Sequence, residues 1–350
     1  MKHAVEYLDR LLKQLSTANG VGYGGNAAQV VIEALKVEGI DASVGHDGSV
    51  HACLEGKGKK GLMLACHLDE IGYIVSRIDD AGRIFISEIG GADVRILPGQ
   101  EVTVLGRKEH RGYIAFKPPH LLSSEERARV VPLEELFIDV GCKPNVVKQD
   151  IRIGDYVTFS SKYKKIGNNL RTAKSLDNRA SVACGILIMK EMAKVEHSFS
   201  VHFVATSQEE YTGLGARIHA FKLPVDYAVI IDVSHGEHPD LKEHEYFPLD
   251  AGPTIVRGAT VPGRLFDLLV ETAQSLEIPY QVQPIVGRTG TDADDIAFSR
   301  QGIPSCVVGI PLRYMHTPVE VVSLKDIERA ARLITRFAGR LEDHALRDTK

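Results

Sequence analysis

A stretch of short β-rich runs interrupts an otherwise regular alternation of helix and strand in this sequence. Before residue 70 and after about residue 165, segments with helical periodicity alternate with apolar runs such as GLMLACH and SVHFVATS. This alternation is typical of an α/β fold. Between these limits, runs such as IGYIVSRID, QEVTVLG and RGYIAFK are separated by Gly, Pro and charged turns, and one helix is expected near SSEERARV. We therefore expect one α/β domain, formed by residues 1–69 and 166–350, with a smaller β-rich insert at 70–165.

The distribution of charge gives no indication of a nucleic-acid or membrane partner. The chain of 350 residues has a formal net charge of −4, with both signs spread along it and without a basic block for phosphates or lipid head groups. Its apolar runs stay short of the roughly 20 residues that a membrane-spanning helix needs. Glu6 and Asp9 stand among apolar residues at helical spacing, which predicts a first helix rather than a targeting segment. Five scattered cysteines indicate reduced thiols, so we expect a cytoplasmic protein.

Polar side chains follow several of the predicted strands at the point where each strand ends. The apolar run GLMLACH ends in a histidine that two acids follow, and a pair of glutamates comes after SVHFVATS. Because open α/β sheets bind ligands at the carboxyl ends of their strands, we expect these side chains to share one crevice. The candidates are His67, Asp69, Asp177, Glu209, Glu210, Asp232 and His316.

Each of these candidates also has a simpler structural explanation when it is considered alone. A histidine and an acid can cap a strand, a Glu-Glu pair can be a solvated loop, and Asp177 can be the N-cap of a helix. Taken together, imidazoles and carboxylates without a required cysteine form a ligand set suited to Zn, Co or Mn. One of two adjacent carboxylates can then bind metal while the other moves a proton. Cys66 is expected in the core, because successive strand residues face opposite ways.

Six motifs of the sequence resemble the M42 family of dinuclear metallo-aminopeptidases, which includes glutamyl and tetrahedral aminopeptidases. The motifs are CHLDEIG, SLDNRA, SQEEYTGLGA, IIDVSHG, GRTGTDADDIA and RYMHTPVEVV, and the resemblance spans nearly the whole chain. It implies a mixed-sheet α/β catalytic domain of the zinc-aminopeptidase type and a barrel-like insert that makes subunit contacts. The implied substrates are peptides with a free N-terminus, and the implied assembly is a homo-oligomer, commonly of twelve subunits.

The same resemblance implies a role for each candidate residue. Two divalent metal ions, Zn or Co with Mn as an alternative, would be held by His67, Asp177, Glu210, Asp232 and His316. Asp177 would bridge the ions, with His67 on one side and His316 on the other. Glu209 would be the general base that activates a metal-bridging water, and Asp69 would be an acid behind His67.

Some parts of the sequence do not decide which reaction is catalysed or what shape the substrate entrance has. The first turn, NGVGYGGNAA, lacks a glutamate that is often found in the family, and Ala251 stands where many members have a lysine. A related deacylase or amidohydrolase acting on N-acylated substrates is one alternative. An endoglucanase-type glycoside hydrolase is a weaker one, since that chemistry needs no metal and the chain has no Trp for sugar stacking. We expect GRTGTDAD to line the crevice, and His235, His238 and His244 to be mostly solvated.

Overall fold

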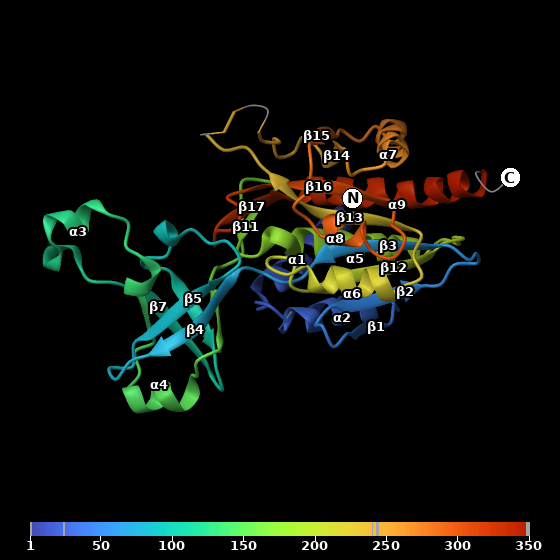
Figure 1. Cartoon of the computed structure of the whole chain (residues 1–350). Coiled ribbons are helices and arrows are strands. Elements are labelled where there is room, and N and C mark those ends of the chain that lie inside the picture. Colours follow the sequence, from blue (N-terminus) through green and yellow to red (C-terminus); the bar gives the residue numbers. More distant parts are fainter. Residues whose placement is uncertain (1, 24, 240, 243–244, 348–350) are drawn as a thin grey trace.

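A mixed sheet of eleven strands forms the centre of the larger body of the protein (Figure 1). The computed structural model describes residues 2–23, 25–239, 241–242 and 245–347. Strands β3, β12, β13 and β16 are parallel neighbours, and antiparallel strands extend the sheet on both sides of them. In spatial order the strands are β1 (Ala42–Val44), β2 (Val50–Leu54), β12 (Ser200–Thr206), β3 (Gly61–His67), β13 (Tyr227–His235), β16 (Ser305–Arg313), β17 (Glu320–Ser323), β11 (Leu170–Ala173) and β10 (Lys164–Ile166).

The central strands are apolar along their length because helices cover the sheet. All seven residues of β3 are buried, which explains why the run GLMLACH shows no alternation of apolar and polar residues. Two more strands, β14 (Thr254–Gly258) and β15 (Gln281–Ile285), pair with each other in parallel, and β14 joins the sheet through β16. The expected mixed-sheet α/β fold is confirmed.

The helices are amphipathic or fully buried according to their place in the layers. In α9, apolar residues recur at helical spacing, so that Ile327, Leu333, Ile334 and Phe337 are buried on one side. Helix α5 packs against α1, α2 and α9 and also lies on β3 and β13. The helices of this body are α1 (Lys2–Thr17), α2 (Ala27–Val37), α5 (Leu176–Met192), α6 (Leu214–Lys222), α7 (Gly263–Ser275), α8 (Ala293–Ile296) and α9 (Leu324–Arg347).

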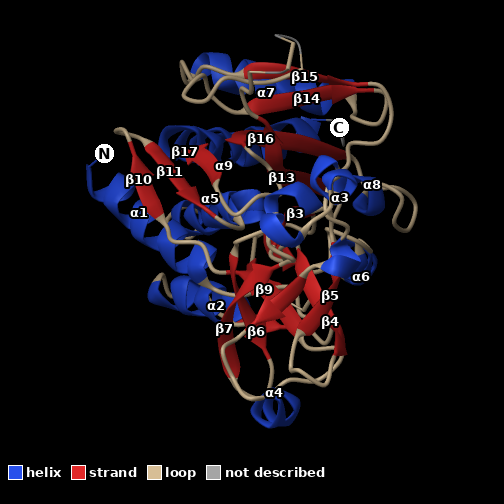
Figure 2. Ribbon diagram, turned by 90° about the vertical axis from the view of Figure 1, so that its left-hand side faces the viewer, coloured by secondary structure: helices blue, strands red, loops and turns tan. Residues whose placement is uncertain are grey.

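The β-rich insert folds into a closed antiparallel barrel that projects from the sheet (Figures 1 and 2). It has an apolar core of its own, to which each of its strands contributes. The expected helix near SSEERARV is α3 (Ser124–Ala128), which begins with a capping box formed by Ser123 and Glu126. A helix that the sequence analysis did not include, α4 (Pro144–Asp150), follows β8. Around the barrel the strands are β4 (Gly72–Ile78), β5 (Ile84–Ile89), β8 (Phe137–Asp139), β7 (Glu109–Ala115), β6 (Glu101–Leu105) and β9 (Tyr156–Phe159).

The first and last strands of the barrel are neighbours. Tyr73 of β4 pairs with Val157 of β9, and Ile74 pairs with Tyr156. The chain therefore leaves the sheet and returns to it at almost the same place. Strand β10, at residues 164–166, already belongs to the large sheet. Among the residues that the structure describes, none of the helices combines the length and apolar character that a bilayer crossing requires.

Candidate active site

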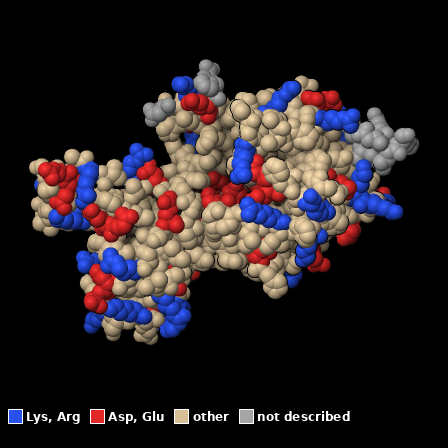
Figure 3. Space-filling view, viewed as in Figure 1, with Lys and Arg blue, Asp and Glu red and all other residues tan. Residues whose placement is uncertain are grey.

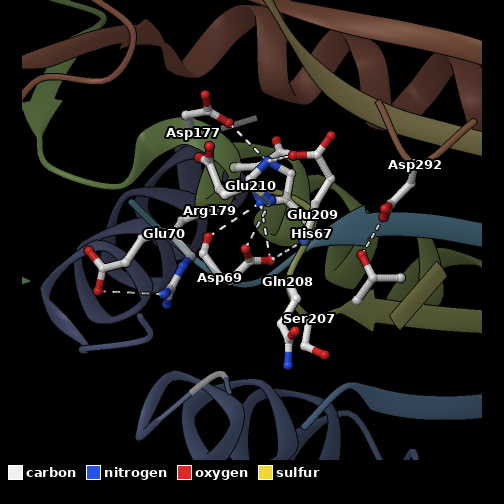
Figure 4. Close-up of polar contacts among 12 residues, drawn as sticks. His67, Asp69, Glu70, Asp177, Arg179, Ser207, Gln208, Glu209, Glu210 and Asp292 are labelled. Carbon is white, nitrogen blue, oxygen red and sulfur yellow. Dashed lines mark hydrogen bonds and ion pairs between the residues drawn. The ribbon is translucent and has the colours of Figure 1, made fainter. Parts of the chain in front are cut away.

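The candidate residues lie at the edge of the sheet where the parallel strands end. His67 is the last residue of β3, and Thr206, the last residue of β12, pairs with it. Asp232 lies in the neighbouring strand β13. Glu209 follows β12 after a short turn, so three adjacent strands deliver side chains to one place. Figure 4 shows the carboxylates of Asp177, Glu209 and Glu210 close to the His67 ring.

One group of potential metal ligands consists of His67, Asp177 and Asp232. The Nε2 atom of His67 lies 3.0 Å from Oδ1 of Asp177 and 3.8 Å from Oδ1 of Asp232. All three residues are buried, and one ligand atom of each lies within 4.8 Å of the others. Asp177 enters from the first turn of α5, where Ser175 rather than Asp177 holds the N-cap position. Its side chain is thus directed to the site rather than to helix capping.

A second group consists of Asp177, Glu210 and His316. The Nε2 atom of His316 lies 3.3 Å from Oε2 of Glu210 and 3.5 Å from Oδ2 of Asp177. Asp177 therefore belongs to both groups and directs one carboxylate oxygen toward each histidine. The structure brings together all five residues that were expected as ligands.

The charge of this cluster fits a site for divalent cations. Burial, together with the neighbouring carboxylates, raises the pKa of Glu209 to about 9 and that of Glu210 to about 8. The hydrogen bond with Asp177 raises the pKa of His316 to about 10. The raised pKa values of the two glutamates and of His316 indicate an excess of negative charge in a buried site. The oxygen and imidazole donors are also those that Zn, Co and Mn accept, so the residues fit the expected metal.

The two neighbouring glutamates have different positions. Glu210 is a member of the second ligand group. Glu209 belongs to neither of the two ligand groups found among the described residues. Oε2 of Glu209 is 3.9 Å from Nε2 of His67, and the side chain is 17% exposed at the cleft. A carboxylate in this place can accept a proton without serving as a ligand.

Asp69 lies beside His67, as expected, and it also holds the glutamate pair. Its carbonyl oxygen is 3.3 Å from Nδ1 of His67, and its Oδ1 is 3.7 Å from the same nitrogen. The carboxylate accepts hydrogen bonds from the backbone N–H groups of Glu209 at 3.1 Å and Glu210 at 3.2 Å. Asp69 thus connects the end of β3 to the loop that follows β12.

A cleft of about 760 Å³ opens over these residues. The loop GRTGTDAD lines one side of it, which confirms that expectation. Acidic side chains gather at the hollow in the middle of this face (Figure 3). His235 also lines the cleft, the ring of His238 contacts Tyr314, and His244 lies outside the described residues.

The sequence profile of the M42 glutamyl aminopeptidase family matches residues 48–333. The chain belongs to the M42 peptidase family. Lysyl aminopeptidase of Pyrococcus furiosus is 28% identical, and the match covers 92% of this chain and 94% of that protein. The TET aminopeptidase of a marine sediment archaeon, Thaumarchaeota archaeon SCGC AB-539-E09, superposes with a TM-score of 0.91 at 29% identity and 99% coverage of both chains. The TET1 peptidase of Pyrococcus horikoshii, which can assemble into a tetrahedron or an octahedral shell, has a TM-score of 0.82 at 27% identity, covering 95% of this chain and 99% of that chain.

This M42 protein is therefore an aminopeptidase, a hydrolase of the EC 3.4.11 type. The M42 family is metal-dependent, and the chain carries two groups of residues that could hold ions. Its structural neighbours include peptidases that form large closed assemblies.

Behind the site of this M42 aminopeptidase, buried charges support the segments that carry the candidate ligands. Glu70 accepts hydrogen bonds from Nζ of Lys174 at 2.5 Å, from the hydroxyl of Ser175 and from the backbone N–H of Gly20 at 2.7 Å. Arg179, which is fully buried, lies with Nη2 4.0 Å from Glu70 and donates to the carbonyl of Leu15. These contacts join β3, the start of α5 and the end of α1.

Three further residues next to the site were missed by the sequence analysis. The carboxylate of Asp292 accepts from the hydroxyl of Thr206 at the end of β12. Glu320 accepts from two backbone N–H groups at the site, and the carbonyl of Gly91 lies next to His316. Asp292 and Glu320 stand inside the motifs GRTGTDADDIA and RYMHTPVEVV, so the motifs contained a signal for them. A backbone carbonyl such as that of Gly91 leaves no signal in the sequence.

Proposed function

We propose that this aminopeptidase removes N-terminal residues from peptides by a mechanism that uses two divalent cations, with Zn or Co favoured and Mn as the alternative. The observation that carries the proposal is the position of Asp177 between the two histidines. One ion would be held by His67, Asp177 and Asp232, and the other by Asp177, Glu210 and His316. When bound, such ions polarise the scissile carbonyl and lower the pKa of a water molecule.

Glu209 is assigned the proton transfer in this proposal. Its carboxylate faces the cleft outside both ligand groups, so it is available to take a proton from the attacking water and to deliver it to the leaving amine. Asp69 keeps this carboxylate in place through the backbone of Glu209, and it holds Glu210 in the same way. A nucleophilic serine or cysteine is not required.

The acidic cleft favours a substrate with a free, positively charged N-terminus. A panel of aminoacyl reporter substrates tests this, with each substrate offered in a free and an N-acetylated form and with Zn, Co or Mn supplied after chelation. We expect hydrolysis of the free forms alone, loss of activity on chelation and recovery with Zn or Co. Preferential cleavage of the acetylated forms would favour the deacylase alternative, and full activity of a protein shown to be metal-free would reject the mechanism.

We also propose different roles for the sheet domain and the barrel. Residues 1–69 and 166–350 would form the catalytic domain, and residues 70–165 would make the contacts between subunits. The barrel projects from the sheet and has its own core, which suits a module for assembly. By analogy with a TET1 structure that is a dodecamer, we propose a homo-oligomer of twelve subunits, and we propose that it is located in the cytoplasm.

A further inference from the structure

Glu320 is a buried carboxylate whose hydrogen bonds come from the main chain of two candidate ligands. It is the first residue of β17 and is 2% exposed. Oε2 accepts a hydrogen bond from the backbone N–H of Asp177 at 3.1 Å, and Oε1 accepts one from the backbone N–H of His316 at 2.9 Å. The two oxygens of one side chain therefore fix the distance between two segments that are far apart in the sequence.

Both of these backbone positions need a partner from outside regular secondary structure. His316 has a φ of 61°, in the left-handed region that residues other than glycine seldom adopt. Asp177 lies within the first turn of α5 but has non-helical angles, with φ −78° and ψ 103°. An unpaired buried N–H costs about as much free energy as a lost hydrogen bond. Glu320 supplies the acceptor for both.

The same arrangement extends to the third member of the second ligand group. The backbone N–H of Glu210 donates to Asp69, another buried carboxylate. Each residue of the second ligand group thus donates its backbone N–H to a carboxylate that belongs to neither ligand group. These residues are Asp177, Glu210 and His316. Moving a carboxylate from water into the protein interior costs free energy. A buried carboxylate acceptor is therefore better explained by its positioning of the ligand residues than by a gain in stability alone.

We infer that Glu320 is a positioning residue that sets the affinity of the second ligand group, Asp177, Glu210 and His316, for its ion. This inference rests on the proposed two-metal site. Glu320 acts on the ion through the backbone of Asp177 and His316, and the first group keeps His67 and Asp232, which Glu320 does not hold. Residues that orient ligands typically change metal affinity 10- to 100-fold when they are replaced.

The substitution Glu320→Gln tests the inference, because it keeps the volume and one acceptor oxygen but turns an NH₂ group toward a backbone N–H. The matched control is Asp326→Asn. Asp326 is fully buried in the first turn of α9 and also accepts two backbone N–H groups, those of Asp250 at 2.7 Å and Gly252 at 3.0 Å. It contacts none of the five candidate ligands through the hydrogen bonds and ion pairs that the structure describes.

The measurement is a Co²⁺ titration of the chelated full-length proteins against a competing chelator, followed by absorption and by bound-metal analysis. We expect two sites in the wild type and in Asp326→Asn. In Glu320→Gln we expect one site to weaken by roughly 10- to 100-fold, with a remaining absorption spectrum that matches His316→Ala loaded with a single ion. Circular dichroism on the chelated proteins checks that each variant is folded.

The other possible outcomes would contradict either the role of Glu320 or the proposed two-metal function. Two unchanged sites in Glu320→Gln, or equal weakening in Asp326→Asn, would overturn the role of Glu320. Fewer than two sites in the wild type would overturn the proposed two-metal function instead. If Glu320→Gln does not fold, Glu320→Asp replaces it, since this variant keeps the charge and both acceptors but withdraws them by one methylene. Unchanged affinity of both sites in Glu320→Asp would also reject the inference.

Discussion

Nδ1 of His316 lies 3.0 Å from the carbonyl oxygen of Gly91, so that a residue of the barrel orients a candidate ligand of the sheet. Gly91 follows β5, and His316 lies between β16 and β17. Because a carbonyl oxygen only accepts, Nδ1 of His316 carries a proton whether the ring is neutral or charged. Nε2 faces Asp177 and Glu210, and it is the nitrogen that could bind an ion. The barrel therefore completes the geometry of the site as well as carrying the proposed subunit contacts.

Removal of the barrel should lower both the size of the assembly and the activity. Replacing residues 72–159 by a short Gly-Ser linker is feasible because β4 and β9 are neighbours. We expect a smaller particle by multi-angle light scattering, because the proposed subunit contacts are lost. We also expect weaker metal binding, because His316 loses the carbonyl of Gly91. An unchanged particle size in a folded deletion variant would show that the contacts lie elsewhere.

The two glutamates of the SQEEYTGLGA motif should respond differently to the same substitution. Glu209→Gln should keep both ions and the substrate affinity while kcat falls by roughly 10² to 10⁴, the range for loss of a general base. Glu210→Gln should lose bound metal together with activity, because Glu210 faces His316 in the second ligand group. Metal analysis and steady-state kinetics on the two variants decide the assignment. Metal loss in Glu209→Gln with full occupancy in Glu210→Gln would reverse it.

Two histidines away from the cleft, His51 and His202, should make the protein less stable in acid. His51 and His202 approach within 3.2 Å through Nε2 and Nδ1, and His219 of α6 lies next to His51 and 3.4 Å from Asp47. Burial, together with the nearby His202, His219 and Lys222, lowers the pKa of His51 to about 4. Burial also lowers the pKa of His202, against the opposing charge of Glu55.

The sign of this effect follows from the unfolded chain, in which a histidine has a pKa of about 6.5. Since the unfolded state binds the proton more readily, the stabilisation is complete above about pH 6.5 and is lost as the pH falls toward 4. The Tm of His51→Gln should therefore decrease less between pH 7 and pH 5 than the Tm of the wild type. Both Tm values are measured on chelated proteins. The exposed His46 provides the control, His46→Gln, which should follow the wild type. Equal losses in all three proteins would contradict the prediction.

Two glycines in helices should respond to alanine in opposite directions. A Cβ atom on Gly185 of α5 would lie 2.3 Å from the ring of Phe203, which is fully buried in β12. Gly185→Ala should therefore lower the free energy of unfolding by about 1–3 kcal/mol through overpacking. A Cβ atom on Gly339 of α9 meets no atom within 4 Å, so Gly339→Ala should raise it by about 0.5–1 kcal/mol. Urea unfolding of the two variants measures both changes, and a stable Gly185→Ala would mean that β12 can shift away from α5.

The sequence predicted the sheet and the site where the signal is local. Buried parallel strands read as continuous apolar runs, so the polar residue at the end of each run stood out, as His67 does after β3. Strand β15 was missed because it is short and lies partly exposed. Helix α4 was missed although Pro144 stands at its first position, a known start signal.

The contacts that hold the site together could not be predicted from the pattern of residues. Asp69 was expected behind His67, but its bonds to the backbone of Glu209 and Glu210 depend on how a distant loop approaches β3. Glu320 is close to His316 in sequence, yet its contact with Asp177 depends on the packing of β17 against the start of α5. Such partners are main-chain groups, which every residue type carries, so sequence alone does not identify them.

The adjacency of β4 and β9 also has a consequence for the order of folding. As long as residues 72–159 are unstructured, they form a long loop whose closure opposes the pairing of β3 with the strands that follow the insert. Each doubling of loop length adds about 0.6 kcal/mol to that entropic cost. Once the barrel has formed, Tyr73 and Val157 are paired, so the two ends of the insert are held next to each other. A barrel that folds first would therefore act as a clamp that accelerates assembly of the sheet around it.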